Sequence, residues 1–215
     1  METPNTDTLE RTSLADRRRA TEAHIVRAFE RVLRRDGVRS VGVNNVVKEA
    51  RVGKGLIYKY FGGLTGLARA WIARKRIWPD FQPLVANKAQ TTEEMAAQIK
   101  AVLRQHAEAL RQEPLALEVL VEELMRPTEL TESFDRIRTE LGEEYCTVFQ
   151  ADAQFSRPEN KAVLLMLYAA VTYLAMRGAT APNYMGHDLS QDKDWQAMLA
   201  MVDLIVDRAA AGPDR

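Results

Sequence analysis

Apolar residues recur at helical spacing along most of the chain, beginning with Ile25, Val26, Phe29, Val32 and Leu33. This stripe predicts a first helix that starts at Ser13 or Thr21 and ends near Asp36, because Gly37 suits the left-handed position that often follows a helix. Residues 1–12 show no such periodicity and predict a flexible arm.

Two short helices are expected next, at 43–50 and 54–61, with a break at Arg51-Val52-Gly53. Helices of this length are not stable alone in water, so both should pack against the first helix. Two such helices joined by a glycine-containing turn form a helix-turn-helix pattern, which we place at residues 42–61.

Beyond Gly63 the same spacing predicts longer helices, with a loop at 179–191 before the last one. They are expected at 64–78, 92–113, 115–125, 129–155, 158–177 and 192–210. No alternating strand pattern and no internal repeat is found. We therefore expect an all-α fold of about nine helices.

The composition fits an ordinary globular protein of 215 residues, 46% of them apolar. Cys146 is the one cysteine, which excludes an internal disulfide and a cysteine-rich zinc site and favours a reducing compartment. The first residues lack the apolar core of a secretory signal, so we expect a cytoplasmic protein. The longest apolar run, 162–176, falls short of the ~20 residues that span a bilayer, and no membrane partner is expected.

The net charge of zero conceals a division along the chain. Residues 1–76 hold 17 Lys and Arg against 8 Asp and Glu, whereas residues 77–215 hold 13 against 22. Charge alone is compatible with solvated helix faces, but a basic segment that also carries a helix-turn-helix pattern favours binding to a polyanion.

In a helix-turn-helix the second helix reads the major groove of DNA. Lys54 stands at the start of that helix, and Tyr58 and Lys59 lie opposite Ile57, so they should face outward. Tyr60 suits either a phosphate contact or packing. The alternative for both tyrosines is a ring buried against the first helix with only the hydroxyl exposed.

The segment Ala50-Arg51-Val52-Gly53-Lys54-Gly55-Leu56-Ile57-Tyr58-Lys59-Tyr60-Phe61 resembles the DNA-binding domain of the TetR family of transcriptional regulators. The resemblance covers roughly residues 13–76. It implies a helix-turn-helix domain at 13–62, an effector-binding and dimerisation domain at 63–211, and a palindromic double-stranded DNA operator. The DNA contacts that it implies are Asn44, Asn45, Lys54, Leu56, Tyr58 and Lys59, and we add Tyr60 to these candidates.

The chain departs from the family pattern at several of these positions. Gly42 and Gly53 replace the frequent Ser or Thr caps, and Leu56 replaces a hydrogen-bonding Thr. The link that is often Pro-Ser-Lys is Gly62-Gly63-Leu64, so the lysine of that link is missing.

The acidic two thirds of the chain lack the motifs of an enzyme. There is no nucleophile elbow, no His-Glu-x-x-His and no phosphate loop, and no His follows a Glu at the spacing of a di-metal bundle. We therefore expect neither catalysis, nor a cofactor, nor a metal.

The last two helices are unusually apolar, 163–176 on nearly every side and 195–206 along a wide stripe. A helix that is apolar all round must be covered all round. Two such helices from each of two subunits could form a four-helix interface in a homodimer, which the resemblance also implies. The alternative is burial inside one subunit.

Aromatic, Met and small polar residues on the predicted inward stripes could line an effector cavity, although each alone also suits a plain core. These candidates are Trp71, Trp78, Phe81, Met95, His106, Met125, Tyr145, Phe149, Met166 and Tyr173. His106 is the sharpest of them because a polar ring on an apolar stripe needs a partner.

These observations predict a one-component regulator, in which a small-molecule effector releases a dimeric repressor from its operator. The alternative is a helical small-molecule carrier or scaffold dimer without sequence-specific DNA binding.

Overall fold

The computed structural model describes residues 6–78 and 87–212. Within those residues it has nine α-helices and a single two-stranded hairpin, so the expected all-α class is confirmed. The chain divides into two compact units. Residues 1–74 and 127–134 form the N-terminal unit, and residues 75–126 and 135–215 form the C-terminal unit.

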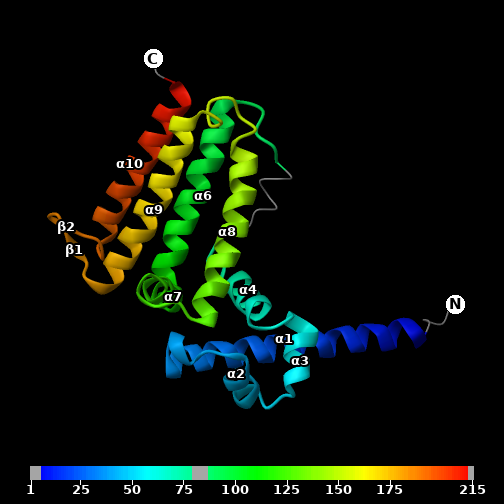
Figure 1. The fold of residues 1–215 in the computed structure, drawn as a ribbon. Helices are drawn as coiled ribbons and strands as arrows, with labels where there is room; N and C mark the ends of the chain where they lie inside the picture. The colour runs from blue at the N-terminus through cyan, green and yellow to red at the C-terminus, as the bar shows by residue number, and fades with distance from the viewer. Residues whose placement is uncertain (1–5, 79–86, 213–215) are drawn as a thin grey trace. The chain divides into compact units, whose positions relative to one another are not determined.

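The N-terminal unit contains α1 (Thr6–Asp36), α2 (Val43–Ala50), α3 (Lys54–Phe61) and α4 (Leu64–Lys75), with a 3-10 turn at Val38–Ser40. Figure 1 shows α2 and α3 beside the long α1. α1 begins at Thr6, so the flexible arm expected for residues 1–12 is wrong from Thr6 onward, and residues 1–5 lie outside the described residues.

The core of this unit follows the apolar stripe of α1. Ile25 and Phe29 are fully buried, and they share this core with Val46 of α2 and Ile57 of α3. Ion pairs add a link between helices, because Glu49 of α2 binds both Arg31 and Arg35 of α1 at 2.7 Å. The two short helices are thus held by α1, as their length requires.

The joint between α3 and α4 depends on glycines. Gly62 and Gly63 both have positive φ, 71° and 122°, which side chains rarely adopt. Gly66, in the first turn of α4, lies so close to the carbonyl of Phe61 that a Cβ would meet its oxygen at 1.7 Å. The turn at Gly62-Gly63 and the absent side chain of Gly66 thus allow the start of α4 to lie close against the carbonyl of Phe61.

The C-terminal unit contains α6 (Thr92–Gln112), α7 (Pro114–Met125), most of α8 (Glu129–Phe149), α9 (Pro158–Thr180) and α10 (Asp192–Ala211). Figure 1 shows α6, α8, α9 and α10 running alongside one another as a bundle. The first residues of α8 belong to the N-terminal unit, where Ser133 hydrogen-bonds Thr65 at 3.0 Å.

Two expectations for the connections are wrong. α8 ends at Phe149, not near 155, because the Asp152 carboxylate accepts hydrogen bonds from the backbone of Gln154 and Phe155 and closes a turn. Residues 179–191 contain a small hairpin of β1 (Asn183–Tyr184) and β2 (His187–Asp188), which are too short to show alternation in the sequence.

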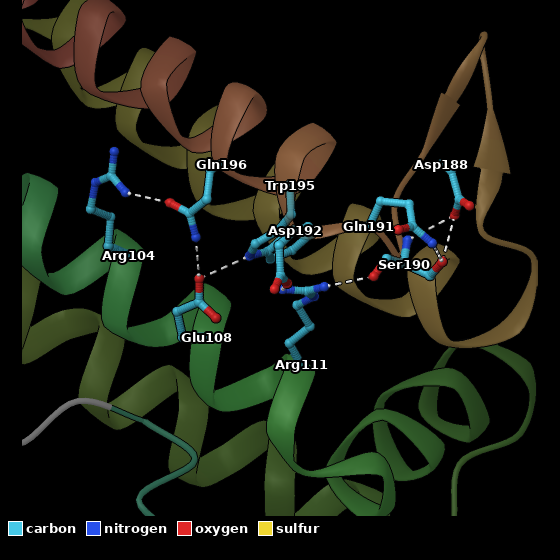
Figure 2. Close-up of polar contacts among 9 residues, drawn as sticks. All are labelled: Arg104, Glu108, Arg111, Asp188, Ser190, Gln191, Asp192, Trp195 and Gln196. Atoms are coloured by element: carbon cyan, nitrogen blue, oxygen red, sulfur yellow. Dashed lines mark hydrogen bonds and ion pairs between the residues drawn. The ribbon is translucent and has the colours of Figure 1, made fainter.

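Polar contacts join α10 to α6 along one side of the bundle (Figure 2). The indole nitrogen of the buried Trp195 donates to the Glu108 carboxylate at 3.0 Å, and Gln196 donates to the same oxygen at 3.1 Å. Arg111 donates to Asp192 at 2.8 Å and lies over the Trp195 ring. Charged side chains at the surface thus fix a helix whose inner side is apolar.

α9 is the one helix in the described parts of the chain that is long and apolar enough to cross a membrane, although the 15-residue apolar run suggested otherwise. Only 17% of its most apolar stretch is buried within the chain. Its apolar surface is therefore largely uncovered in a single copy.

Candidate nucleic-acid interface and ligand cavity

The second helix of the helix-turn-helix, α3, presents a polar side to solvent. Ile57 is fully buried on the inner side and anchors the helix. Lys54, Tyr58 and Lys59 are exposed, and the Tyr58 side chain keeps 51% of its accessible surface. The Lys54 ammonium lies 6.0 Å from the centre of the Tyr58 ring, so a cation and an aromatic ring stand side by side on this surface.

Both asparagines at the start of α2 are exposed. The Asn45 side-chain amide donates to the carbonyl of Ser40 at 2.6 Å, so it closes the turn before the helix. Gly42 supplies no side-chain cap to α2, although its carbonyl accepts hydrogen bonds from the backbone amides of Asn45 and Val46. Asn45 therefore has a structural role, while Asn44 projects from the surface.

A groove of about 430 Å³ in the N-terminal unit brings together Asn44, Asn45, Lys54 and Tyr58. It also contains Arg39, which the sequence reasoning missed although a basic residue just before a helix N-terminus is a signal for phosphate binding. The groove thus contains two cationic side chains, two side-chain amides and a hydroxyl, which are donors of the kind that bind DNA phosphates. It also contains one carboxylate, that of Glu129.

The other three predicted DNA contacts lie outside this groove. Lys59 is exposed on α3, and Leu56 is half-buried. The half-buried Tyr60 ring lies under the guanidinium of Arg18 of α1, 5.2 Å from its centre. Tyr60 is thus positioned for packing against α1 rather than held out with Tyr58.

Comparison with known families agrees with this geometry. Residues 25–70, which run from the buried core of α1 through the helix-turn-helix into α4, match the family model of bacterial regulatory proteins, tetR family. These residues are a helix-turn-helix domain of the TetR family. The match supports a DNA-binding transcriptional regulator, and regulators of this family are generally not enzymes. No curated protein matches the chain.

The C-terminal unit, which lies outside the matched residues, has a cavity of about 330 Å³ between α6, α8 and α9. Four of the effector candidates line it, Trp78, His106, Tyr145 and Phe149. The reasoning from sequence missed Tyr168, Arg138, Phe155 and Gly142, which also line it. Tyr168 could have been identified from the sequence as a candidate for the cavity, because it lies four residues before Thr172 on a mostly apolar helix.

His106 is buried at the wall of the cavity. Its Nε2 lies 3.0 Å from the hydroxyl of Thr172, and its ring stacks on Tyr168 at 4.7 Å. Burial, with a smaller effect of the Arg138 charge, lowers the pKa of His106 to about 4. The backbone of Ile77 favours the protonated ring, but no well-aligned hydrogen bond reaches Nδ1. His106 is therefore neutral at pH 7.

Arg138 is the half-buried charge of the cavity wall. Its guanidinium donates to Glu123 at 2.9 Å and to Asp135 at 2.6 Å. Burial is the largest single effect and opposes the charge, but the hydrogen bonding and charge of Glu123, together with the charge of Asp135, outweigh it and leave the pKa of Arg138 raised. Burial raises the pKa of Tyr168 to about 12, so its hydroxyl stays protonated.

The remaining effector candidates lie elsewhere. Trp71 is in the core of the N-terminal unit, 5.8 Å from Phe29 and 5.9 Å from Phe134. Met95 is buried outside the cavity. Met125, Met166 and Tyr173 are 72%, 62% and 45% exposed. Phe81 lies outside the described residues. Trp71, Met95, Met125, Met166 and Tyr173 therefore do not line the cavity. Helical spacing in the sequence does not show which neighbouring helix each side of a helix will face.

Proposed function

We propose that this protein is a homodimeric cytoplasmic repressor that a small-molecule effector releases from a palindromic operator. The observation that carries the proposal is the exposed side of α3, where Lys54, Tyr58 and Lys59 stand opposite the buried Ile57. A helix anchored on one side and polar on the other can enter a major groove without losing its support.

Dimerisation is supported by apolar residues left exposed on the last two helices. They are Leu165, Met166 and Tyr173 on α9 and Met201, Leu204 and Ile205 on α10. In soluble proteins, large apolar residues exposed together mark an interaction site. A second copy, related by a twofold axis, would cover it and give the protein the symmetry of a palindrome.

Effector release is supported by the cavity in the C-terminal unit and by α8. This helix supplies cavity residues such as Tyr145 and, nearer its start, residues of the N-terminal unit such as Phe134. An effector that binds one arrangement of α8 more tightly would shift the population toward it. We propose that the favoured arrangement does not fit the operator.

A gel shift with DNA from upstream of the protein's own coding sequence tests the proposal. The full-length protein should retard this DNA at concentrations that leave unrelated DNA free. Lys59→Ala should weaken binding and reduce the slope of log K against log salt concentration by about one. Lys193→Ala, an exposed lysine on α10, is the matched control and should behave as the wild type.

The alternative is a helical carrier or scaffold dimer that no longer reads sequence. Leu56 in place of a hydrogen-bonding residue, together with the turn-closing role of Asn45, favours it. Equal retardation of upstream and unrelated DNA would support this alternative against the repressor.

A further inference from the structure

The hairpin between α9 and α10 ends in a turn that is unfavourable for one of its residues. β1 and β2 pair through Tyr184 and His187, which leaves Met185 and Gly186 as a two-residue loop. Both loop residues have positive φ, 50° and 84°, as type I′ hairpin turns require. Asn, Asp or Gly usually takes the first of these positions, because positive φ brings the Cβ of other residues too close to the backbone. Met185 is therefore held in a strained conformation.

Met185 is also the most exposed large apolar residue among those that the structure describes. It keeps 84% of its accessible surface. Within one copy, the burial of this side chain does little to offset the strain of the turn. Strained residues are concentrated at functional sites, and exposed apolar groups at interaction sites, so the two observations together favour a role in binding.

The hairpin adjoins the exposed apolar side of α9. The Tyr184 ring, next to Met185 in the chain, packs edge-on against Tyr173 of α9 with ring centres 6.0 Å apart. The Arg177 guanidinium lies 5.1 Å from the centre of the same Tyr184 ring. Tyr173 follows Met166 by two helical turns on the same side of α9, so the exposed side of this helix continues onto the hairpin. Figure 1 shows the hairpin projecting from the bundle where α9 leads into α10.

The exposed apolar residues of α9 and α10 alone would form a small interface. There are three on each helix, and each is 41–69% exposed. A stable interface takes about 20–30 residues from each partner, so the contact must extend beyond these six. The hairpin adds a further apolar residue at the edge of this surface. A second copy carries the same surface and, related by a twofold axis, would give these side chains apolar partners.

We propose that the Met185 tip of the hairpin packs against the second copy of the chain and extends the α9–α10 interface of the dimer. This inference rests on the proposed homodimer. It adds the hairpin to an interface otherwise made by two long helices. Burial of Met185 against the partner compensates for the strain of its turn.

Limited oxidation by hydrogen peroxide, followed by mass spectrometry, measures whether Met185 is covered. Met125 of α7 is the internal reference, because it is 72% exposed in one copy and lies outside the proposed interface. In the full-length dimer, Met185 should form its sulfoxide about fivefold more slowly than Met125, in proportion to the exposure that it loses. In Met166→Glu combined with Leu204→Glu, which should be monomeric, the two rates should be equal.

Met185→Asn separates the apolar contact from the turn. Asn adopts positive φ more readily than Met, so the hairpin should be retained while the contact is lost. Sedimentation equilibrium should show the dissociation constant of the dimer raised at least about tenfold, because two Met side chains leave the interface. Met125→Asn is the matched control and should dissociate as the wild type does. In the monomeric background the urea midpoint of Met185→Asn should not fall, whereas a purely structural role for Met185 would lower it.

Two results would overturn the inference. One is oxidation of Met185 at the rate of Met125 in a dimeric wild type, which would leave the tip free for a partner other than this chain. The other is a Met185→Asn dimer as tight as the wild type. Either result leaves the proposed homodimeric regulator intact. A wild type that sediments as a monomer would instead refute the proposed homodimer, and this inference with it.

Discussion

The buried ring of His106 makes stability depend on pH. The folded protein holds the pKa of this imidazole at about 4, below the 6.5 of an unfolded chain. Between these values the unfolded chain binds more protons, so the free energy of unfolding is highest above pH 6.5 and falls as pH falls toward 4. A shift of this size corresponds to a loss of about 3 kcal/mol.

Urea denaturation of the wild type and His106→Phe at several pH values checks this prediction. Carboxylates and the other two histidines titrate in the same window, but they are present in both proteins. The difference between the two curves isolates His106, and it should shrink or reverse in favour of the variant as pH falls. A difference that does not change with pH would show that the ring is not buried and neutral.

Replacing a glycine by alanine should change the stability of the protein in opposite directions at Gly66, where two helices join, and at Gly142, inside a helix. Gly66 abuts the Phe61 carbonyl at the joint of α3 and α4, whereas Gly142 lies inside α8 next to open space. Gly66→Ala should destabilise the protein by at least about 2 kcal/mol, since backbone must move to admit the Cβ. Gly142→Ala should stabilise it by up to about 1 kcal/mol through helix propensity.

Urea midpoints of the two variants measure both effects. Gly66→Ala should also weaken DNA binding, because α3 is fixed to α4 through this contact. If Gly66→Ala unfolds at the wild-type midpoint, the close approach of α4 to Phe61 is absent in solution.

Local pattern was enough to predict some elements and not others. α2 and α3 were predicted at their observed bounds because glycines flank both and the buried Ile57 fixes the exposed side of α3. The start of α1 was missed because residues 6–12 have no apolar periodicity. The end of α8 was missed because the apolar Phe155 continues its stripe, while the Asp152 turn depends on side-chain hydrogen bonds.

The cavity was only partly predictable for a different reason. Helical spacing identified His106 as a polar ring on an inward stripe, but it does not identify the facing helix. Tyr168 and Arg138 became recognisable only once α8 and α9 were seen to enclose the same space as α6. Met166 and Tyr173 were assigned inward because α9 is apolar on several sides, one of which is exposed.

The whole molecule is expected to be a dimer, because one copy leaves the apolar sides of α9 and α10 exposed. Sedimentation should give twice the 24.3 kDa of one chain. Met166→Glu combined with Leu204→Glu should yield monomers, since four carboxylates would be buried in the pair. Thr147→Glu, at an exposed position of α8, is the control and should remain dimeric. A double variant that stays dimeric would place the interface elsewhere.

Nuclease footprinting on the upstream DNA tests the central claim most directly, because it combines the recognition helix with the twofold symmetry. A dimer that presents two α3 helices should protect two half-sites of inverted sequence, centred about 34 Å or a multiple of that apart along the duplex. Tyr58→Ala should lose both half-sites together. Protection of one unpaired site, or none that differs from unrelated DNA, would contradict the account.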